Sequence, residues 1–206
     1  MNEDILSSRK YKEHYLPLLE KYGNSAEGVD WRSEKEEIVF SQFKKLLPNN
    51  ESFTINDLGC GNSRFLNYLI QNNYSFDYIG YDILEEMISK SRDYYPEHKF
   101  VKINDSSELK LSDYSIGSGI LNLKYDMSDE EFKSLCLNII DNLHSFSKKG
   151  FAFNGLVTPY GEYETRNHLY YWDTDWLLCY LEKKYNSKIN LYKGYFGLDF
   201  TVIIKK

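Results

Sequence analysis

The chain is poor in cysteine and proline, and it lacks any long apolar run. Its 206 residues include three cysteines and four prolines, and no stretch approaches the roughly 18 apolar residues that indicate a membrane-spanning helix. Cys60, Cys136 and Cys179 form no CxxC pair, which argues against a disulfide framework and a zinc site. The first residues, MNEDILSSRKYKEHY, are charged throughout and contain no apolar signal segment. We therefore expect a cytoplasmic protein without a membrane partner.

Basic side chains are also few, and arginine is especially scarce. The chain has 31 acidic and 25 basic residues, a formal net charge of −6, and its five arginines are scattered along the sequence. A general nucleic-acid binder needs a basic stripe that replaces the counterions around phosphates. HExxH, GxSxG and Walker-type motifs are missing as well. We therefore expect neither a nucleic-acid partner nor a bound metal, and the sequence leaves the oligomeric state open.

Strand-like and helix-like segments alternate along most of the chain. Apolar segments predict strands at 53–58, 76–82, 98–103, 114–121 and 150–157, and the segments KINLYKGY and LDFTVIIKK predict a closing antiparallel pair. Apolar residues at helical spacing predict helices at 7–22, 34–47, 63–73, 84–95 and 173–185. This alternation predicts a doubly wound α/β fold: a mostly parallel seven-stranded sheet with helices on both faces and an antiparallel C-terminal hairpin at one edge.

The clearest predicted helix lies between the fourth and fifth strands. Its apolar face carries Phe132, Leu135, Cys136, Ile139, Ile140 and Leu143, spaced as one stripe of an α-helix. Ser128 and Glu131 are placed as a capping box at its start. A Tyr-rich polar insertion follows the fifth strand and extends to Tyr171.

A glycine turn between the first strand and the next helix is the most informative segment. The sequence Ile55-Asn-Asp-Leu-Gly-Cys-Gly-Asn-Ser63 ends a strand, turns on Gly59 and Gly61, and starts a helix. Such a turn exposes backbone N–H groups to a ligand at the carboxyl edge of the sheet. Asp82 ends the second strand 21 residues after Gly61, where a carboxylate can bind a ribose diol. The pattern predicts a nucleoside site.

Two residues favour a sulfonium nucleoside over a dinucleotide at this site. A dinucleotide fingerprint GxGxxG would place glycine at position 64, where the chain has Arg64. Asp57, two residues before Gly59, would repel a pyrophosphate and attract an ammonium or sulfonium group. S-adenosylmethionine (AdoMet) carries both cations and no phosphate. AdoMet is therefore the expected cofactor, and an NAD-linked reductase of similar topology is the disfavoured alternative.

The segment INDLGCGNS resembles the first motif of the class I (Rossmann-like) AdoMet-dependent methyltransferases, and the resemblance covers residues 34–206. It departs from the family at Ser63, where a third glycine is common. The resemblance implies an N-terminal helical cap or lid over residues 1–48 and an AdoMet-binding domain over residues 49–206. The segments SGILN and GFAFNGL resemble a small-molecule or saccharide branch of the family.

The resemblance also assigns cofactor-binding roles. It implies that Gly59, Gly61 and Asp57 bind the methionine part, that Asp82 binds the ribose hydroxyls and that Ile83 lies against the adenine. It further places Asp105 and Ser106 at the adenine amino group, and Ser118 and Gly119 under the methionine ammonium. Cys60, inside the turn, belongs to the same binding loop as a small filler and is not expected to be a nucleophile.

Catalytic candidates follow the fourth and fifth strands. A base can assist methyl transfer to an oxygen or nitrogen acceptor, and the sequence leaves open whether one is used. Candidate bases lie within 160–173: Glu162, Glu164, His168, Tyr170, Tyr171 and Asp173. His168 is our choice, with a solvated loop histidine as the structural alternative. Asn122 can hydrogen-bond an acceptor, or it is only a turn residue.

The sequence therefore predicts a methyltransferase that uses AdoMet, yields S-adenosylhomocysteine (AdoHcy) and methylates an oxygen or nitrogen of a small-molecule acceptor, for which a saccharide is one candidate type. A protein or RNA methyltransferase and a non-catalytic AdoMet-binding module are the alternatives.

Overall fold

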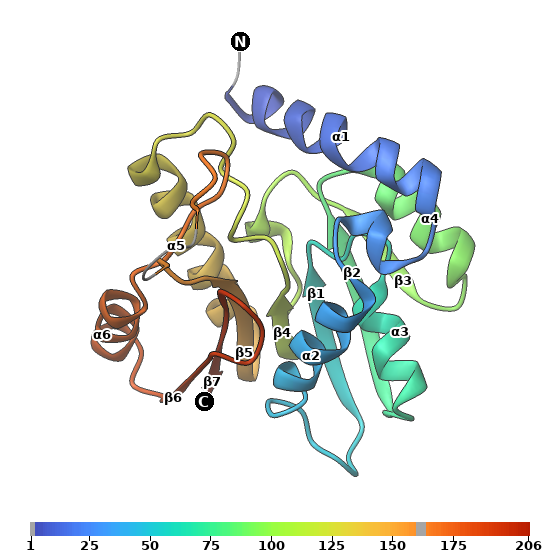
Figure 1. Cartoon of the computed structure of the whole chain (residues 1–206). Helices are drawn as coiled ribbons and strands as arrows, with labels where there is room; N and C mark the ends of the chain where they lie inside the picture. Colours follow the sequence, from blue (N-terminus) through green and yellow to red (C-terminus); the bar gives the residue numbers. More distant parts are fainter. Residues whose placement is uncertain (1–2, 160–163) are drawn as a thin grey trace.

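Five adjacent parallel strands form one side of the sheet, and the C-terminal hairpin forms the other. In the computed structural model, which describes residues 3–159 and 164–206, the strand order is β3-β2-β1-β4-β5-β7-β6 (Figure 1). The strands are β1 (Phe53–Leu58), β2 (Phe76–Asp82), β3 (Lys99–Lys102), β4 (Ser112–Gly117), β5 (Ser147–Leu156), β6 (Lys188–Lys193) and β7 (Asp199–Lys205). Strand β7 runs antiparallel to both of its neighbours, β5 and β6, so it alone points opposite to the other strands. The predicted doubly wound sheet with an antiparallel C-terminal hairpin is confirmed.

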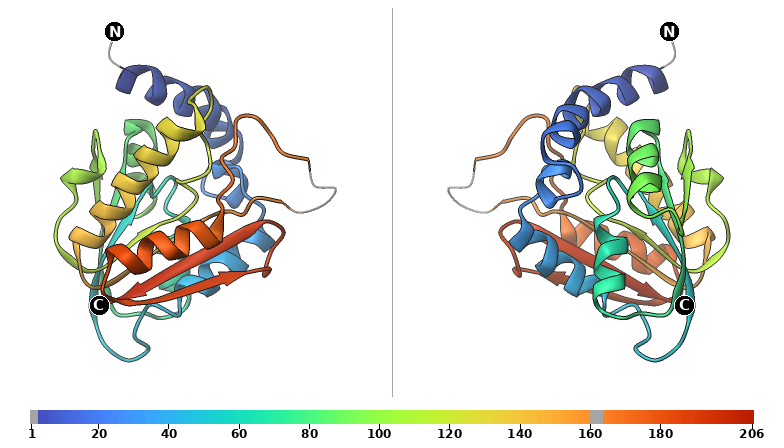
Figure 2. Two further views of the ribbon diagram at one scale, coloured as in Figure 1. Left: turned by 90° about the vertical axis from the view of Figure 1, so that its left-hand side faces the viewer. Right: turned by 90° about the vertical axis from the view of Figure 1, so that its right-hand side faces the viewer.

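Helices cover both faces of this sheet (Figure 2). They are α1 (Glu3–Tyr22), α2 (Ser33–Phe43), α3 (Arg64–Gln71), α4 (Glu85–Tyr94), α5 (Asp129–Ser145) and α6 (Thr174–Lys184), with short 3₁₀ helices η1 (Ala26–Val29) and η2 (Ser106–Glu108). Side chains of α5 and α6 pack on one face in a single apolar cluster. Side chains of α2 and α3 pack on the other face in a second cluster. Burying each large apolar side chain stabilises the fold by about 1.5–3 kcal/mol.

Helix α5 shows how the sequence pattern sets the packing. Its buried residues Phe132, Cys136, Ile140 and Leu143 are spaced four, four and three apart, as a single helical stripe requires. Ser128 accepts a hydrogen bond from the backbone N–H of Glu131, and the Glu131 side chain returns one to the backbone N–H of Ser128. Both the predicted helix and its predicted capping box are therefore confirmed.

The fourth strand is shorter at its carboxyl end than the sequence predicted. The expectation was a strand over 114–121, whereas β4 ends at Gly117. The reason is Gly119, whose φ of 75° belongs to the left-handed region, where a glycine is favoured and a strand cannot continue. The chain therefore turns at 118–120, directly above the carboxyl end of β4.

The amino-terminal segment crosses the carboxyl ends of the central strands. The hydroxyl of Tyr11 donates a 2.7 Å hydrogen bond to the carbonyl of Leu123, in the loop after β4. Lys12 forms an ion pair with Glu86 at the start of α4. Helix α2 contributes Phe43 to the apolar cluster that also contains residues of β1. The division into a cap over 1–48 and a domain over 49–206 stays a prediction.

Candidate functional site

The glycine turn is held in a shape that only glycine accepts easily. The backbone N–H groups of Gly59 and Cys60 both donate to the carbonyl of Tyr81, at 2.7 and 3.0 Å. Gly59 and Gly61 have φ values of 71° and 52°, in the left-handed region that disfavours a Cβ. A Cβ on Gly61 would lie 2.9 Å from the side chain of Val29, and one on Gly59 would collide with Ile120. The turn is therefore fixed to β2 and closely covered.

Asp82 links the end of β2 to this turn. Its Oδ2 accepts the backbone N–H of Gly61 and its Oδ1 accepts that of Leu84, both at 2.9 Å. Burial raises the pKa of the carboxyl, and the backbone hydrogen bonds oppose this rise. Each carboxylate oxygen has two lone pairs, so one on each oxygen is left for a ligand hydroxyl. The predicted ribose-binding role thus fits the geometry.

Asp57 lies deep at the end of β1 and has one side-chain partner. The hydroxyl of Tyr78 donates to its Oδ2 at 2.7 Å, and both residues are buried. Burial raises the pKa of Asp57 to about 7, because desolvation outweighs the hydrogen bond from Tyr78. The carboxyl therefore changes charge near neutral pH. Burial also raises the pKa of the neighbouring Cys60 thiol, which agrees with a filler and not a nucleophile.

The predicted adenine-side residues lie around the ends of β2 and β3. Ile83 packs with Leu84 beneath α1. Asp105 is exposed and caps η2 by accepting the backbone N–H of Ser107 at 2.7 Å. The Ser107 side chain and, to a smaller extent, its backbone N–H lower the pKa of Asp105. Ser106 is buried and its hydroxyl accepts a hydrogen bond from Asn142 at 2.8 Å. These roles stay predictions.

The turn after β4 reveals a residue that the sequence analysis missed. Asn154, at 0% exposure near the end of β5, accepts the backbone N–H of Gly119 on its Oδ1 at 2.7 Å. Its Nδ2 and the Oγ of Ser118 are buried without a hydrogen-bond partner among the described residues. Asn154 was missed because it reads as one polar residue in the apolar segment GFAFNGL, and only the sheet register places it beside Gly119.

The two predicted catalytic residues differ in burial. Asn122 is buried, with its Oδ1 unpartnered among the described residues and its carbonyl accepting the N–H of Tyr170 at 2.7 Å. His168 is exposed, and its carbonyl accepts the N–H groups of Lys124 and Tyr125. The segment that carries His168 therefore lies against the loop that follows Asn122. Glu162 lies outside the described residues.

Aromatic side chains of the amino-terminal segment cover the site. Trp31 lies over Gly119, since a Cβ there would be 3.1 Å from its ring. Tyr15 is partly buried against Leu19, Leu84 and Met87, and desolvation raises the pKa of its hydroxyl. The rings of Tyr11 and Tyr125 meet edge to face, 5.0 Å apart. The lidding role of the amino-terminal segment is a proposal that these contacts support.

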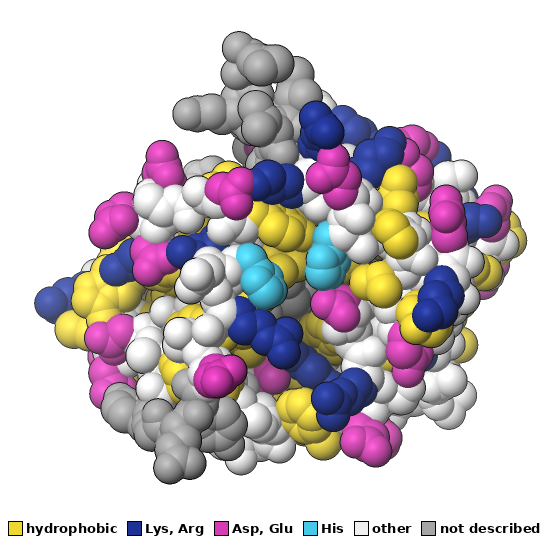
Figure 3. Space-filling model, turned by 45° about the horizontal axis from the view of Figure 1, so that its top comes forward, with side chains coloured by type: hydrophobic (Ala, Val, Ile, Leu, Met, Phe, Trp, Pro, Cys, Tyr) yellow, Lys and Arg dark blue, Asp and Glu magenta, His cyan; other side chains and the backbone are white. Residues whose placement is uncertain are grey.

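Charged groups surround this covered site on the molecular surface. In Figure 3 the face that carries α1 is hollowed at its centre, with histidine side chains at the rim and lysine and arginine side chains beside them. His14 Nε2 lies 3.2 Å from Oδ2 of Asp30, and this hydrogen bond lowers the pKa of Asp30. The charges of Arg166 and Lys35 act on Asp30 in the same direction. A polar acceptor would meet charged groups here.

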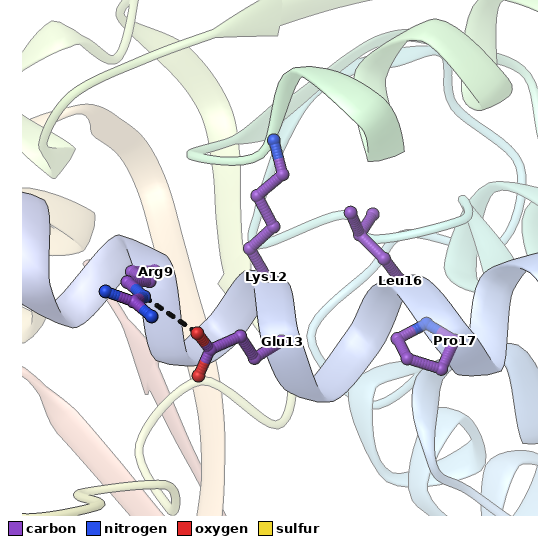
Figure 4. A pocket seen from close by; sticks show the side chains of 5 residues that line it. All are labelled: Arg9, Lys12, Glu13, Leu16 and Pro17. Atoms are coloured by element: carbon purple, nitrogen blue, oxygen red, sulfur yellow. Dashed lines mark hydrogen bonds and ion pairs between the residues drawn. The ribbon is translucent and has the colours of Figure 1, made fainter.

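A second hollow lies along α1 and is separate from the glycine turn. Its lining residues are Arg9, Lys12, Glu13, Leu16 and Pro17 (Figure 4). All come from one helix, and none is a predicted cofactor residue. Within residues 3–159 and 164–206, no helix is long and apolar enough to cross a membrane. The same part of the chain contains no group of three or more His, Cys, Asp or Glu residues placed to hold a metal.

The chain resembles known methyltransferases. A Mycobacterium tuberculosis protein named "Putative methyltransferase Rv1506c" is 29% identical over 157 residues, 76% of this chain and 95% of that protein. Magnesium protoporphyrin IX methyltransferase from Synechocystis PCC 6803, solved with bound AdoMet, matches with a TM-score of 0.69 at 16% identity, over 100% of this chain and 98% of that one. An O-methyltransferase family protein from Burkholderia thailandensis matches with a TM-score of 0.64 at 12% identity, over 98% and 71%. No protein-family model matches.

The fold is therefore that of the class I AdoMet-dependent methyltransferases. The fold class predicted from the sequence is confirmed by the solved neighbours. The predicted resemblance to methyltransferases is borne out by the curated relative. The predicted cofactor agrees with neighbours that were solved with AdoMet and with AdoHcy bound.

Proposed function

We propose that this chain transfers the methyl group of AdoMet to an oxygen or nitrogen atom of a small, polar acceptor. One observation carries the proposal: Asp57, Asp82, Ser118 and the glycine turn meet at the carboxyl ends of the adjacent strands β1, β2 and β4. The order of strands reverses direction between β1 and β4, and ligands of open α/β sheets bind at such a switch point.

The residues at this switch point fit AdoMet. Ser118 and Asn154 present buried polar atoms without partners among the described residues, which is costly unless a ligand satisfies them. Asp82 keeps lone pairs for the ribose hydroxyls, and Asp57 supplies negative charge for the ammonium. Gly59 and Gly61 have no side chains that could fill the space beside the turn.

When bound, AdoMet supplies an activated methyl group on a cationic sulfur. The acceptor's oxygen or nitrogen forms a bond to that carbon as the carbon–sulfur bond breaks and its electron pair stays on sulfur. The protein's main task is to align the two reactants. We assign Asn122 to orient the acceptor and His168 to take its proton. Trp31 and Tyr11 exclude water from the covered site, given their contacts with Gly119 and Leu123.

The polar surroundings support a small polar acceptor. His14 is hydrogen-bonded to Asp30, and the charges of Lys35 and Arg166 act on the same carboxylate. Such groups bind hydroxylated or amino-bearing molecules better than apolar ones. A saccharide-type acceptor is consistent with this set. We also propose a cytoplasmic setting, which the absence of disulfides between Cys60, Cys136 and Cys179 supports.

The test is AdoHcy formation from methyl-labelled AdoMet in the presence of separate acceptor panels: saccharides, phenols, small amines, total RNA and denatured protein. We expect the label to appear on a small molecule. Label on RNA or protein would contradict the acceptor class and support the macromolecular alternative. Tight AdoHcy binding with no label transfer in any panel would support the non-catalytic binding module.

A further inference from the structure

The face of the sheet beneath α2 changes from apolar to polar along β5 and β7. Ala152 and Ile203 pair with each other and belong to the apolar cluster on this face. Strand residues alternate between the two faces of a sheet, so Asn154 and its pair partner Thr201 lie on the same face, nearer the carboxyl end of β5. Asp199, two residues before Thr201, continues this polar row. The polar end of the face therefore extends from the cofactor strands to β7.

Asp199 is a buried acid at the start of β7, with 3% of its surface exposed. Among the described residues its ion-pair partner is Lys35 of α2, whose Nζ approaches Oδ1 to 3.0 Å without the alignment of a hydrogen bond. Burial raises the pKa of the carboxyl, and the charge of Lys35 opposes this rise. An ionised carboxylate offers about four acceptor positions, so Asp199 can still accept hydrogen bonds from a bound molecule.

Trp31 connects this ion pair to the turn after β4. The Nζ of Lys35 lies 4.9 Å from the centre of the Trp31 ring, and the same ring lies 3.1 Å from the position of a Cβ on Gly119. The ion pair thus lies beside the cofactor strands, on the side away from β2 and Asp82. An acceptor must lie next to the cofactor to receive its methyl group, and β7 carries none of the predicted cofactor residues.

The packing of α2 does not depend on this ion pair. Val39, Phe40 and Phe43 of the same helix are buried in the apolar cluster. A buried ion pair often stabilises a fold less than apolar residues of similar size, because the cost of desolvation offsets the attraction. A binding role therefore explains a buried acid at position 199 better than a purely structural one.

We propose that Asp199 is a specificity residue that accepts a hydrogen bond from a hydroxyl group of an uncharged, polyhydroxylated acceptor, and that Lys35 is its positioning residue. The inference rests on the proposed function. Because the two side chains neutralise each other, an ammonium on the acceptor would meet the like charge of Lys35, and a carboxylate would meet that of Asp199. A hydroxyl group carries no charge, and it can donate to Asp199 while it accepts from Lys35.

The test measures kcat/KM for methyl transfer from labelled AdoMet to three sets of acceptors: neutral glycosides and polyols, amino sugars, and uronic acids. The parent protein should prefer the neutral set. Asp199→Asn leaves the charge of Lys35 unpaired, so kcat/KM for the neutral set should fall roughly tenfold or more, and the preference should shift toward uronic acids. Lys35→Met leaves the charge of Asp199 unpaired and should shift the preference toward amino sugars.

Asp113→Asn is the matched control, because Asp113 forms an ion pair with Lys149 at the amino end of β4, at 3.6 Å. It should keep the preference of the parent, and AdoHcy should bind all four proteins with equal affinity in titration calorimetry. A merely structural ion pair would, when broken, lower transfer to all three sets alike, and this result would overturn the proposal.

Three other results would also overturn it: a parent that prefers a charged set, a parent that methylates none of the three sets, and an unchanged preference in either Asp199→Asn or Lys35→Met. Failure of the parent to bind AdoHcy would instead overturn the proposed function itself, so the two failures are distinguishable.

Discussion

The hydroxyl of Tyr78, on β2, donates a 2.7 Å hydrogen bond to Oδ2 of Asp57, on β1. The two strands are paired in parallel, with Tyr78 opposite Ile55. The contact joins a buried acid of the cofactor site to a buried phenol that no sequence motif marks. Because burial raises the pKa of Asp57 to about 7, this one pair makes the site sensitive to pH.

Folding stability should therefore fall as pH rises toward neutrality. The pKa of Asp57 is raised from 3.8 to about 7, so between these values the folded protein holds a proton that the unfolded chain has lost. The stabilising contribution is complete below about pH 4 and is lost as pH rises through about 7. Asp57→Asn should remove this part of the pH dependence and raise the melting temperature at pH 8. If the melting temperatures of parent and variant changed with pH at the same slope, Asp57 would not be the source of this pH dependence.

Cofactor affinity should change with pH in the opposite direction. An ionised Asp57 attracts the ammonium of AdoHcy, so binding should strengthen as pH rises through about 7. Tyr78→Phe removes a hydrogen bond to the charged form, which should move the midpoint to higher pH. Calorimetry across a pH series measures both. A midpoint that stays in place in Tyr78→Phe would show that the hydroxyl does not act on Asp57.

Asp82→Ala should weaken AdoHcy binding by about 1–3 kcal/mol, which is roughly 5- to 150-fold in affinity. The variant loses the carboxylate that holds the N–H groups of Gly61 and Leu84 and that faces the predicted ribose position. Asp105→Ala is a useful comparison, because Asp105 is an exposed acid predicted at the adenine. If Asp82→Ala bound AdoHcy like the parent, the nucleoside site would have to lie elsewhere.

Gly61→Val should be more severe than Asp82→Ala. Gly61 has a φ of 52°, and a Cβ there would lie 2.9 Å from Val29, so the new side chain both strains the turn and blocks its surface. We expect loss of measurable AdoHcy binding together with a lower melting temperature. Gly194→Val, at a left-handed position with nothing within 4 Å of a Cβ, controls for strain alone. If Gly61→Val and Gly194→Val bound AdoHcy with equal affinity, a side chain at position 61 would not block the binding surface of the turn.

The amino-terminal cover should slow cofactor release. Tyr11→Phe removes the hydrogen bond to the carbonyl of Leu123, a loss of about 0.5–1.5 kcal/mol, and should speed AdoHcy dissociation by up to roughly tenfold. Stopped-flow displacement measures the rate. Tyr22→Phe, at the exposed end of the same helix, should dissociate like the parent. Equal rates in all three proteins would mean that the cover does not gate the site.

Once an acceptor is identified, His168→Ala should lower kcat roughly 10²-fold or more and leave AdoHcy affinity unchanged, as expected for loss of a base. His14→Ala is the comparison, because His14 is hydrogen-bonded to Asp30 and its ring packs against that of Tyr15. A loss of kcat in His168→Ala that His14→Ala does not share would support the assignment. Full activity in His168→Ala would remove it from the mechanism.

The sequence predicted the elements whose pattern is local. The stripe of Phe132, Cys136, Ile140 and Leu143 and the cap at Ser128 were readable because helix spacing and capping depend on near neighbours. The glycine turn and Asp82 were readable because their spacing follows from one strand–helix–strand unit. The end of β4 was misjudged because the left-handed conformation of Gly119 outweighs the apolar pattern.

Residues whose roles depend on the register between strands were not predictable. Asn154 meets Gly119 only because β4 and β5 pair as Gly117 with Phe153. Tyr78 meets Asp57 only through the β1–β2 pairing. Both contacts join residues of different strands or their ends, and no sequence motif marks Asn154 or Tyr78 as a partner.

The most direct test of the account is titration calorimetry of the purified chain with AdoMet, AdoHcy and NADH. The account predicts binding of AdoMet and AdoHcy in the micromolar range and no useful binding of NADH. The reason is the buried Asp57 at the end of β1, which favours a cationic amino-acid end over a pyrophosphate. Tighter binding of NADH than of AdoHcy would contradict the assignment of the site and of the methyl transfer that depends on it.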